Sequence, residues 1–157
     1  MALLEGLLRY VELLSLTVWV GGIVFFSFIA SPSIFGVLGI DHGGKVVRQI
    51  FPTYYGLGYG AGGVGTIAAI LLGLRGAPGQ GLIALLLAMM TATFLYMGRI
   101  LRPQILRVRA EVKSLEAPEA DPAVHARFHR LHRYSVLLNS GVLMLGLLAL
   151  FLFAWHG

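Results

Sequence analysis

Four apolar stretches, each long enough to cross a bilayer as a helix, constrain this chain more than any other feature of its sequence. About 20 helical residues span roughly 30 Å of hydrocarbon, and a helix satisfies its backbone polar groups within itself. The stretches cover residues 7–29, 54–74 and 81–100 and the apolar part of a last helix that runs to about Trp155. The pattern predicts an all-α integral membrane protein, a four-helix bundle built as one domain over residues 1–157.

The composition agrees with this reading. Hydrophobic residues make up 57% of the chain and charged residues 12%, and the mean hydropathy is +0.82. One water-soluble core cannot hide that much apolar surface, so the lipid bilayer is the expected partner. The lack of cysteine excludes disulfides, thiolate metal sites, iron-sulfur clusters and c-type haem attachment. The net charge of +5 comes from basic residues that flank apolar spans, which predicts no nucleic-acid partner.

Prolines and glycines set the expected element boundaries. Ser31-Pro32 is predicted to end the first helix, because proline lacks an amide donor and restricts the residue before it. A short amphipathic connector follows and is expected to end at Phe51-Pro52. The turn at 75–80 permits only an antiparallel hairpin. The polar stretch 99–121 is expected to begin as a helical extension into the cytoplasm, and Asp121-Pro122 to start the last helix.

The basic residues predict the orientation. Of the 12 lysines and arginines, Arg9 and Arg75 lie on one side of the expected bundle, and the others lie in the connector and around the third loop. Loops rich in Lys and Arg stay in the cytoplasm. We therefore expect a multi-pass protein of the cell membrane with both termini on the outer side.

Glycines crowd the second apolar stretch, at positions 56, 58, 60, 62, 63 and 65. Residues 60–65 fit the spacing G-x-G-x-x-G, but no strand precedes them and they lie inside a membrane-length run, so a dinucleotide site is not indicated. Gly58 and Gly62 form a G-x-x-x-G pair, which is typical of close helix packing in membranes. The pattern favours a homo-oligomer through this helix, although contact within one bundle explains it equally well.

One stripe of the first helix carries three ionisable residues. Glu5, Arg9, Glu12, Leu16 and Trp19 recur at helical spacing, so they share one face. Charged residues in a span usually face the bundle interior and pair, and Arg9 and Glu12 are spaced to do so. An interfacial ion pair is the purely structural interpretation. Because Glu12 is the deepest of the three, it is the candidate proton or cation site.

The last helix carries His125, His129 and His132 at offsets i, i+4 and i+7. Imidazoles one turn apart can share a metal ion, so His129 and His132 are candidate metal ligands. Three arginines are interleaved with them and oppose a bound cation, at positions 127, 130 and 133. The competing interpretation is a basic collar that contacts lipid phosphates.

His132 lies at the expected membrane boundary, where its ring could point inward above Asn139. His42 of the connector is on the same predicted side. His132, with His42 or His129, could therefore supply axial ligands to a b-type haem, and Asn139 and Trp19 complete the candidate cofactor set. A glycine-rich neighbouring helix would leave room for the flat macrocycle.

Three segments resemble a known family. The stretch WVGGIVFF at 19–26, IFPTYY at 50–55 and FHRLHRYS at 128–135 look like the signatures of the transmembrane protein 205-like family, in which the counterparts of His132 and Asn139 recur. The chain is also distantly similar to four-helix membrane proteins of the CopD and HemJ kind. That second resemblance implies copper handling or haem chemistry.

These observations leave three hypotheses open. The first is a b-type haem protein that transfers electrons within the membrane. The second is a small oligomeric transporter or channel for a cation, metal or small solute, lined by Glu12, Arg9 and Asn139. The third is an accessory membrane protein without a pathway, and no residue pattern decides whether the protein is an enzyme.

Overall fold

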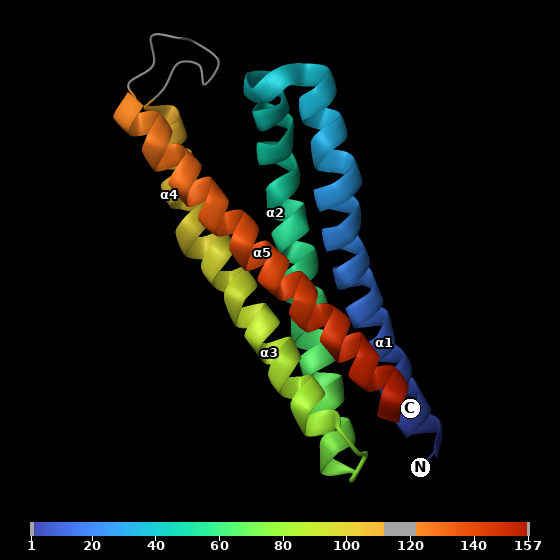
Figure 1. Cartoon of the computed structure of the whole chain (residues 1–157). Helices are drawn as coiled ribbons and strands as arrows, with labels where there is room; N and C mark the ends of the chain where they lie inside the picture. The colour runs from blue at the N-terminus through green and yellow to red at the C-terminus, as the bar shows by residue number, and fades with distance from the viewer. Residues whose placement is uncertain (1, 112–121, 157) are drawn as a thin grey trace.

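The computed structural model describes residues 2–111 and 122–156, and it is built from helices joined by short turns. Figure 1 shows them in chain order. They are α1 (Ala2–Phe25), the π-helix η1 (Phe26–Ala30), α2 (Ser31–Leu74), α3 (Gln80–Tyr96), the π-helix η2 (Met97–Leu101), α4 (Arg102–Ala110) and α5 (Pro122–His156). No strand occurs among these residues, so the all-α prediction is confirmed for them.

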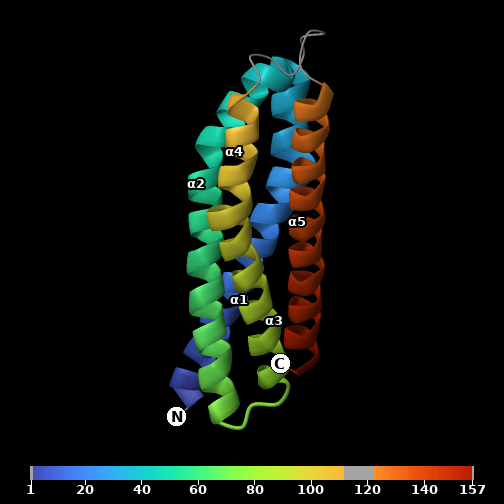
Figure 2. The same cartoon turned by 90° about the vertical axis from the view of Figure 1, so that its left-hand side faces the viewer.

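The long helices pack side by side as a bundle. Helix α1 contacts α2 and α5, and α3 contacts the same two helices. Both chain ends and the α2–α3 turn lie at one end of the bundle, whereas the start of α5 and the end of α4 lie at the other (Figures 1 and 2). Helix α4 continues the direction of α3 through η2, as expected for a helical extension.

The helix does not stop at Ser31-Pro32, so that predicted boundary was wrong. The chain passes through η1, where the Ser31 amide donates to the Phe26 carbonyl, one residue further back than in an α-helix. The same wide turn occurs at η2, just before Pro103, where the Arg102 amide donates to Met97. A π turn takes up one extra residue, which lets a helix absorb a proline that lacks its donor.

The chain reverses at Gly39, within α2, instead. Its backbone has φ 68° and ψ −179°, a conformation that is essentially restricted to glycine. The expected end at Phe51-Pro52 was also wrong, because Pro52 lies inside α2. Its missing amide leaves the Arg48 carbonyl without a helical donor, and the Arg102 Nη2 group donates to that carbonyl at 3.3 Å.

Helix α4 also contacts the part of α2 that follows the bend at Gly39. Arg109 Nη2 and Asp41 Oδ1 are 2.7 Å apart in an ion pair between α4 and α2. Helix α5 begins at Pro122 as predicted, while Asp121, the expected cap, lies outside the described residues. The two contacts from α4 therefore brace this end of the bundle.

The outer surface is strongly apolar. Val37, Leu74 and Trp155 are 83%, 80% and 73% exposed, and further large hydrophobic side chains are exposed on every long helix. Within the described ranges, three helical runs are long and apolar enough to cross a membrane: Ala2–Leu74, Gln80–Ala110 and Pro122–His156. A surface of this kind is stable in lipid rather than in water, so the structure is that of a membrane protein.

Glycines of α2 divide between two faces. Gly58, Gly62 and Gly65 are buried, and a Cβ atom at Gly62 would overlap Thr91 and Trp19. A Cβ atom at Gly56, Gly60 or Gly63 would meet no other atom within 4 Å. The Gly58–Gly62 pair therefore joins helices within one bundle, and the oligomer through this helix stays a prediction.

Gly62→Ala is expected to destabilise the bundle by about 1–3 kcal/mol, because the methyl group forces Trp19 or Thr91 to move. Gly60→Ala is the matched control: it is expected to be neutral or to stabilise by up to about 1 kcal/mol, because the site is open and alanine favours helix. Unfolding in mixed detergent micelles, followed by circular dichroism, measures both. Equal effects of the two substitutions would contradict the assigned faces.

Candidate functional site

The buried carboxyl of Glu12 is the feature of the interior that packing does not explain. Its side chain is 0% exposed, and neither carboxyl oxygen has a hydrogen-bond partner within the described part of the chain. The side-chain amide of Gln80 is 1% exposed and faces the carboxyl as a hydrogen-bond donor, without closing to a full hydrogen bond. Gln80 Oε1 likewise has no partner among the described residues. Buried polar groups are nearly always hydrogen-bonded, so this cluster needs an explanation.

Helix periodicity brings Glu12 to this position. Leu16, Trp19 and Ile23 follow it on the same face of α1, and all four side chains are buried. The predicted inward stripe is therefore confirmed over its deeper part. Its first members, Glu5 and Arg9, remain partly exposed nearer the end of the helix.

The α2–α3 turn positions Gln80. Gly79, with φ 75°, ends the turn and Gln80 begins α3 directly after it. The ring of His156, at the end of α5, packs against Gly79. Gln80 was not singled out from the sequence, because a glutamine beside a turn looks like an ordinary helix-start residue. Only the tertiary structure, which places it beside Glu12, shows that its amide is buried.

Arg9 does not pair with Glu12 as expected. In the described ranges the two side chains form no ion pair, although Arg9 is the charged group whose field acts on Glu12. The reason is their depth: Glu12 turns into the bundle toward Gln80, while Arg9 stays partly exposed. The carboxyl is therefore left in an apolar interior without a bonded counter-charge.

Aromatic rings fill the interior beyond Glu12 along the bundle. Trp19 is buried against Phe94, with ring centroids 5.1 Å apart, and its Nε1 has no partner in the described part. Phe94 in turn contacts Tyr54 and Tyr55. We call the connected rings the aromatic cluster, which comprises Trp19, Phe26, Phe51, Tyr54, Tyr55, Tyr59 and Phe94. Trp19, Tyr55 and Phe94 are buried in the core, and the other rings are partly buried.

Asn139 joins three helical elements. The Tyr54 hydroxyl donates to Asn139 Oδ1 at 2.8 Å, and Asn139 Nδ2 donates to Ser27 Oγ at 3.2 Å. Both hydrogen bonds run between helical elements that are distant in the sequence. The side-chain amide of Asn139 accepts one of these bonds and donates the other, so contacts between helices account for its position.

The candidate histidines lie on the surface. His42, His129 and His132 are all exposed. His129 stacks on His125 with centroids 6.3 Å apart, and His132 stacks on Phe128 at 6.1 Å. Across the described ranges, no three His, Asp or Glu side chains gather in a way that could hold a metal ion. The haem and metal roles of these histidines, with Trp19, stay predictions.

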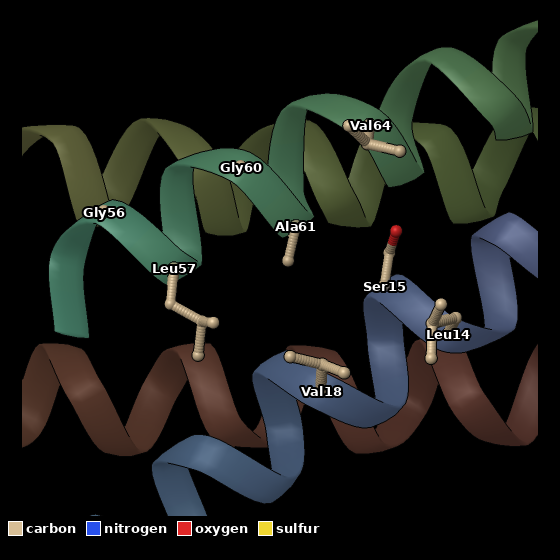
Figure 3. Close-up of a pocket in the computed structure, with 8 residues that line it drawn as sticks. All are labelled: Leu14, Ser15, Val18, Gly56, Leu57, Gly60, Ala61 and Val64. Atoms are coloured by element: carbon tan, nitrogen blue, oxygen red, sulfur yellow. The ribbon is translucent and has the colours of Figure 1, made fainter. Parts of the chain in front are cut away.

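An apolar groove of about 310 Å³ lies between α1 and α2 (Figure 3). Its walls include Val18, Leu57 and Val64, and its glycines are the outward-facing Gly56 and Gly60. Ser15, one helical turn beyond Glu12, also lines it and directs its hydroxyl into the space. Glu12 itself is not part of the lining, so the groove and the buried carboxyl are separate features.

Long apolar helices and an apolar surface indicate a small helical-bundle membrane protein, and among the described residues Glu12 is the acidic side chain that is buried. Residues 14–114 match the family described as "Domain of unknown function (DUF4149)", and the chain belongs to that family. Comparisons with curated proteins and with solved structures found no match. The matched segment contains Trp19, His42 and Gln80, whereas Glu12 and Asn139 lie outside it. The resemblances to the transmembrane protein 205-like family and to CopD and HemJ stay predictions.

Asn139→Leu is expected to cost about 1–3 kcal/mol of stability, because it leaves the buried Tyr54 hydroxyl without its acceptor. Ser140→Ala, at an exposed neighbour on α5, is the control and is expected to be neutral. In a double-mutant cycle with Tyr54→Phe, unfolding free energies should show coupling between positions 54 and 139. Strict additivity would argue against the bond.

Proposed function

We propose that the chain crosses the membrane four times, through α1, α2, α3 and α5, with both termini outside. Two observations support this arrangement. The 73-residue run Ala2–Leu74 bends back at Gly39 and is far longer than the roughly 20 residues that cross a bilayer. The start of α1, which carries Arg9, and the α2–α3 turn, which carries Arg75, lie at the end of the bundle with the chain termini. The segment after the bend at Gly39, with Lys45 and Arg48, and α4 with its arginines lie at the other end.

A periplasm- or exterior-active reporter such as alkaline phosphatase, fused after Gly157, is expected to be active. A green fluorescent protein fusion at the same site should be dark if exported through the general secretory route. The paired fusions measure the side on which the C-terminus lies. A fluorescent and phosphatase-inactive pair would reverse the proposed orientation.

We propose that the protein is a transporter that moves a cation or a proton by way of Glu12. The observation that carries this proposal is the complete burial of a carboxyl group without a hydrogen-bonded or ion-paired partner. An acidic residue at the centre of a span costs about 2.5–3.5 kcal/mol on insertion scales, and such residues usually mark ion or proton pathways. The buried carboxylate of Glu12 therefore needs a bound proton, a bound cation or a hydrogen-bond donor.

The packing favours a carrier over an open pore. Glu12 lies about 15 Å along α1 from Ala2, at the helical rise of about 1.5 Å per residue, so access from the outer end is short. In the other direction Trp19 and Phe94 are fully packed and block the interior. An ion that reaches Glu12 can pass further only if the aromatic cluster moves, which is the behaviour of a gated carrier.

Flux measurements in proteoliposomes test the transport function. A pH-sensitive dye and a sodium-sensitive dye inside the vesicles report proton and cation entry under an imposed gradient. The wild-type protein is expected to raise one of these fluxes above that of protein-free vesicles, and Glu12→Gln is expected to lower it at least tenfold. Glu5→Gln is the matched control, because Glu5 lies on the same stripe but is partly exposed.

Two results would contradict this function. One is wild-type flux equal to that of protein-free vesicles for protons, sodium and potassium alike. The other is full flux in Glu12→Gln, with the variant shown to be folded by its circular dichroism and its elution from a gel-filtration column.

A further inference from the structure

The polar group that faces the Glu12 carboxyl is the side-chain amide of Gln80, at the start of α3. This amide is 1% exposed and faces the carboxyl as a hydrogen-bond donor, without closing to a full hydrogen bond. The Glu12 side chain itself is 0% exposed. A carboxylate buried to that degree beside one incomplete donor is costly, whereas the neutral acid is not. The site therefore favours a state in which a bound ion neutralises Glu12.

The described residues do not offer Glu12 a coordination shell for a metal ion. Among them, Glu12 is the acidic side chain that is buried, and no three His, Asp or Glu side chains gather as a metal site. The Gln80 group that faces the carboxyl is an N–H donor, which repels a cation. Ca²⁺ and Mg²⁺ take about six or more oxygen ligands, and K⁺ in channel filters is held by rings of carbonyl oxygens. A proton needs only one carboxyl oxygen, so the site fits a proton.

We propose that the ion bound at Glu12 is a proton, and that Gln80 is a positioning residue whose amide stabilises the ionised carboxylate after the proton leaves. This inference rests on the proposed transport function, because it names the ion that the same site carries. The carboxyl O–H bond is the one that forms and breaks. Its electron pair stays on the Glu12 oxygen, and water at the end of the bundle accepts the proton.

A neutral amide suits a site that must hold both protonation states. The N–H of an amide stabilises a carboxylate by hydrogen bonding without adding a full positive charge. An arginine or lysine at the position of Gln80 would form a lasting ion pair and hold Glu12 ionised. The α2–α3 turn fixes the amide in place, because Gly79 directly precedes Gln80 and the ring of His156 packs against Gly79. Gln80 can therefore assist proton release without preventing proton uptake.

The charged surroundings of Glu12 also permit exchange. Within the described ranges, the other ionisable side chains at this end of the bundle are Glu5, Arg9, Tyr10, Arg75 and His156, and none of them is buried. Arg9 adds positive potential at Glu12 but forms no ion pair with it in the described part of the chain. The other long helices carry no ionisable side chain over residues 60–74, 81–95 and 140–155. Proton exchange at Glu12 therefore depends on its burial, on Gln80 and on the field of Arg9.

Infrared difference spectroscopy of the full chain in liposomes tests the proton site. A protonated carboxyl has a carbonyl stretch that a carboxylate lacks, and the part of this band that Glu12→Gln removes belongs to Glu12. As the pH is raised, the Glu12 band is expected to disappear in one step. The midpoint of this step is expected to be the same in sodium, potassium and choline chloride, because no metal ion competes for the carboxyl.

Variants of Gln80 test its role. Gln80→Leu is expected to move the midpoint upward by about one pH unit, because the ionised carboxylate loses its donor. Gln80→Asn, which keeps the amide on a shorter side chain, is expected to move it by less. Glu5→Gln on α1 and Gln104→Leu at an exposed position of α4 are the matched controls, and neither should change the midpoint. Circular dichroism and gel filtration establish that each variant is folded.

A Glu12 band that is absent at every pH, or that persists at every pH, would overturn the proton site. A midpoint that falls when sodium or potassium replaces choline would also overturn it, by assigning a metal cation to Glu12. An unchanged midpoint in Gln80→Leu would reject the role of Gln80. Glu12-dependent sodium or potassium flux without this titration would keep the transporter and reject the proton site. A complete titration without flux in vesicles would keep the proton site and reject the transporter.

Discussion

Hydrocarbon offers no hydrogen-bond partners, so a backbone carbonyl that loses its helical donor inside this bundle needs another donor. Pro32 and Pro103 are each preceded by a π turn that re-spaces the helical bonds. Pro52 leaves the Arg48 carbonyl free, and the guanidinium of Arg102 supplies the missing donor. The chain thus keeps three prolines in or beside long helices, and the run Ala2–Leu74 bends back at Gly39 instead. Arg102 belongs to α4, so this helix supplies the donor for the carbonyl that Pro52 leaves free.

Four side chains keep buried polar atoms without a hydrogen-bond partner among the described residues: Glu12, Trp19, Gln80 and Arg102. Glu12 is the acidic one among them. Tyr54, Asn139 and Ser27 show that the same bundle can pair its partly buried side chains across helices. Nothing comparable reaches the carboxyl of Glu12 within the described residues. The proposed transport role of Glu12 rests on that contrast. In that proposal, the aromatic cluster beyond Glu12 is the barrier that must move before an ion can pass.

Much of this architecture could be predicted from hydrophobic length and helical spacing. The long helices and the inward face of α1 that carries Glu12 follow from local patterns. The bend at Gly39 could not be predicted, because prolines are the stronger breakers and the π turns that absorb them depend on packing. Gln80 was missed for a similar reason, since its burial depends on how the helices pack around it in three dimensions. The helical spacing of the histidines predicted a ligand site, whereas His129 and His132 lie on the surface of the bundle.

The central claim is that the Glu12 carboxyl lies in an apolar interior closed to water. Carbodiimide modification of the membrane-embedded protein, read by mass spectrometry of each peptide, tests it most directly. We predict that the hydrophobic reagent dicyclohexylcarbodiimide labels Glu12, while a water-soluble carbodiimide labels Glu5 and leaves Glu12 unmodified. Labelling of Glu12 by the water-soluble reagent as fast as Glu5 would contradict the account.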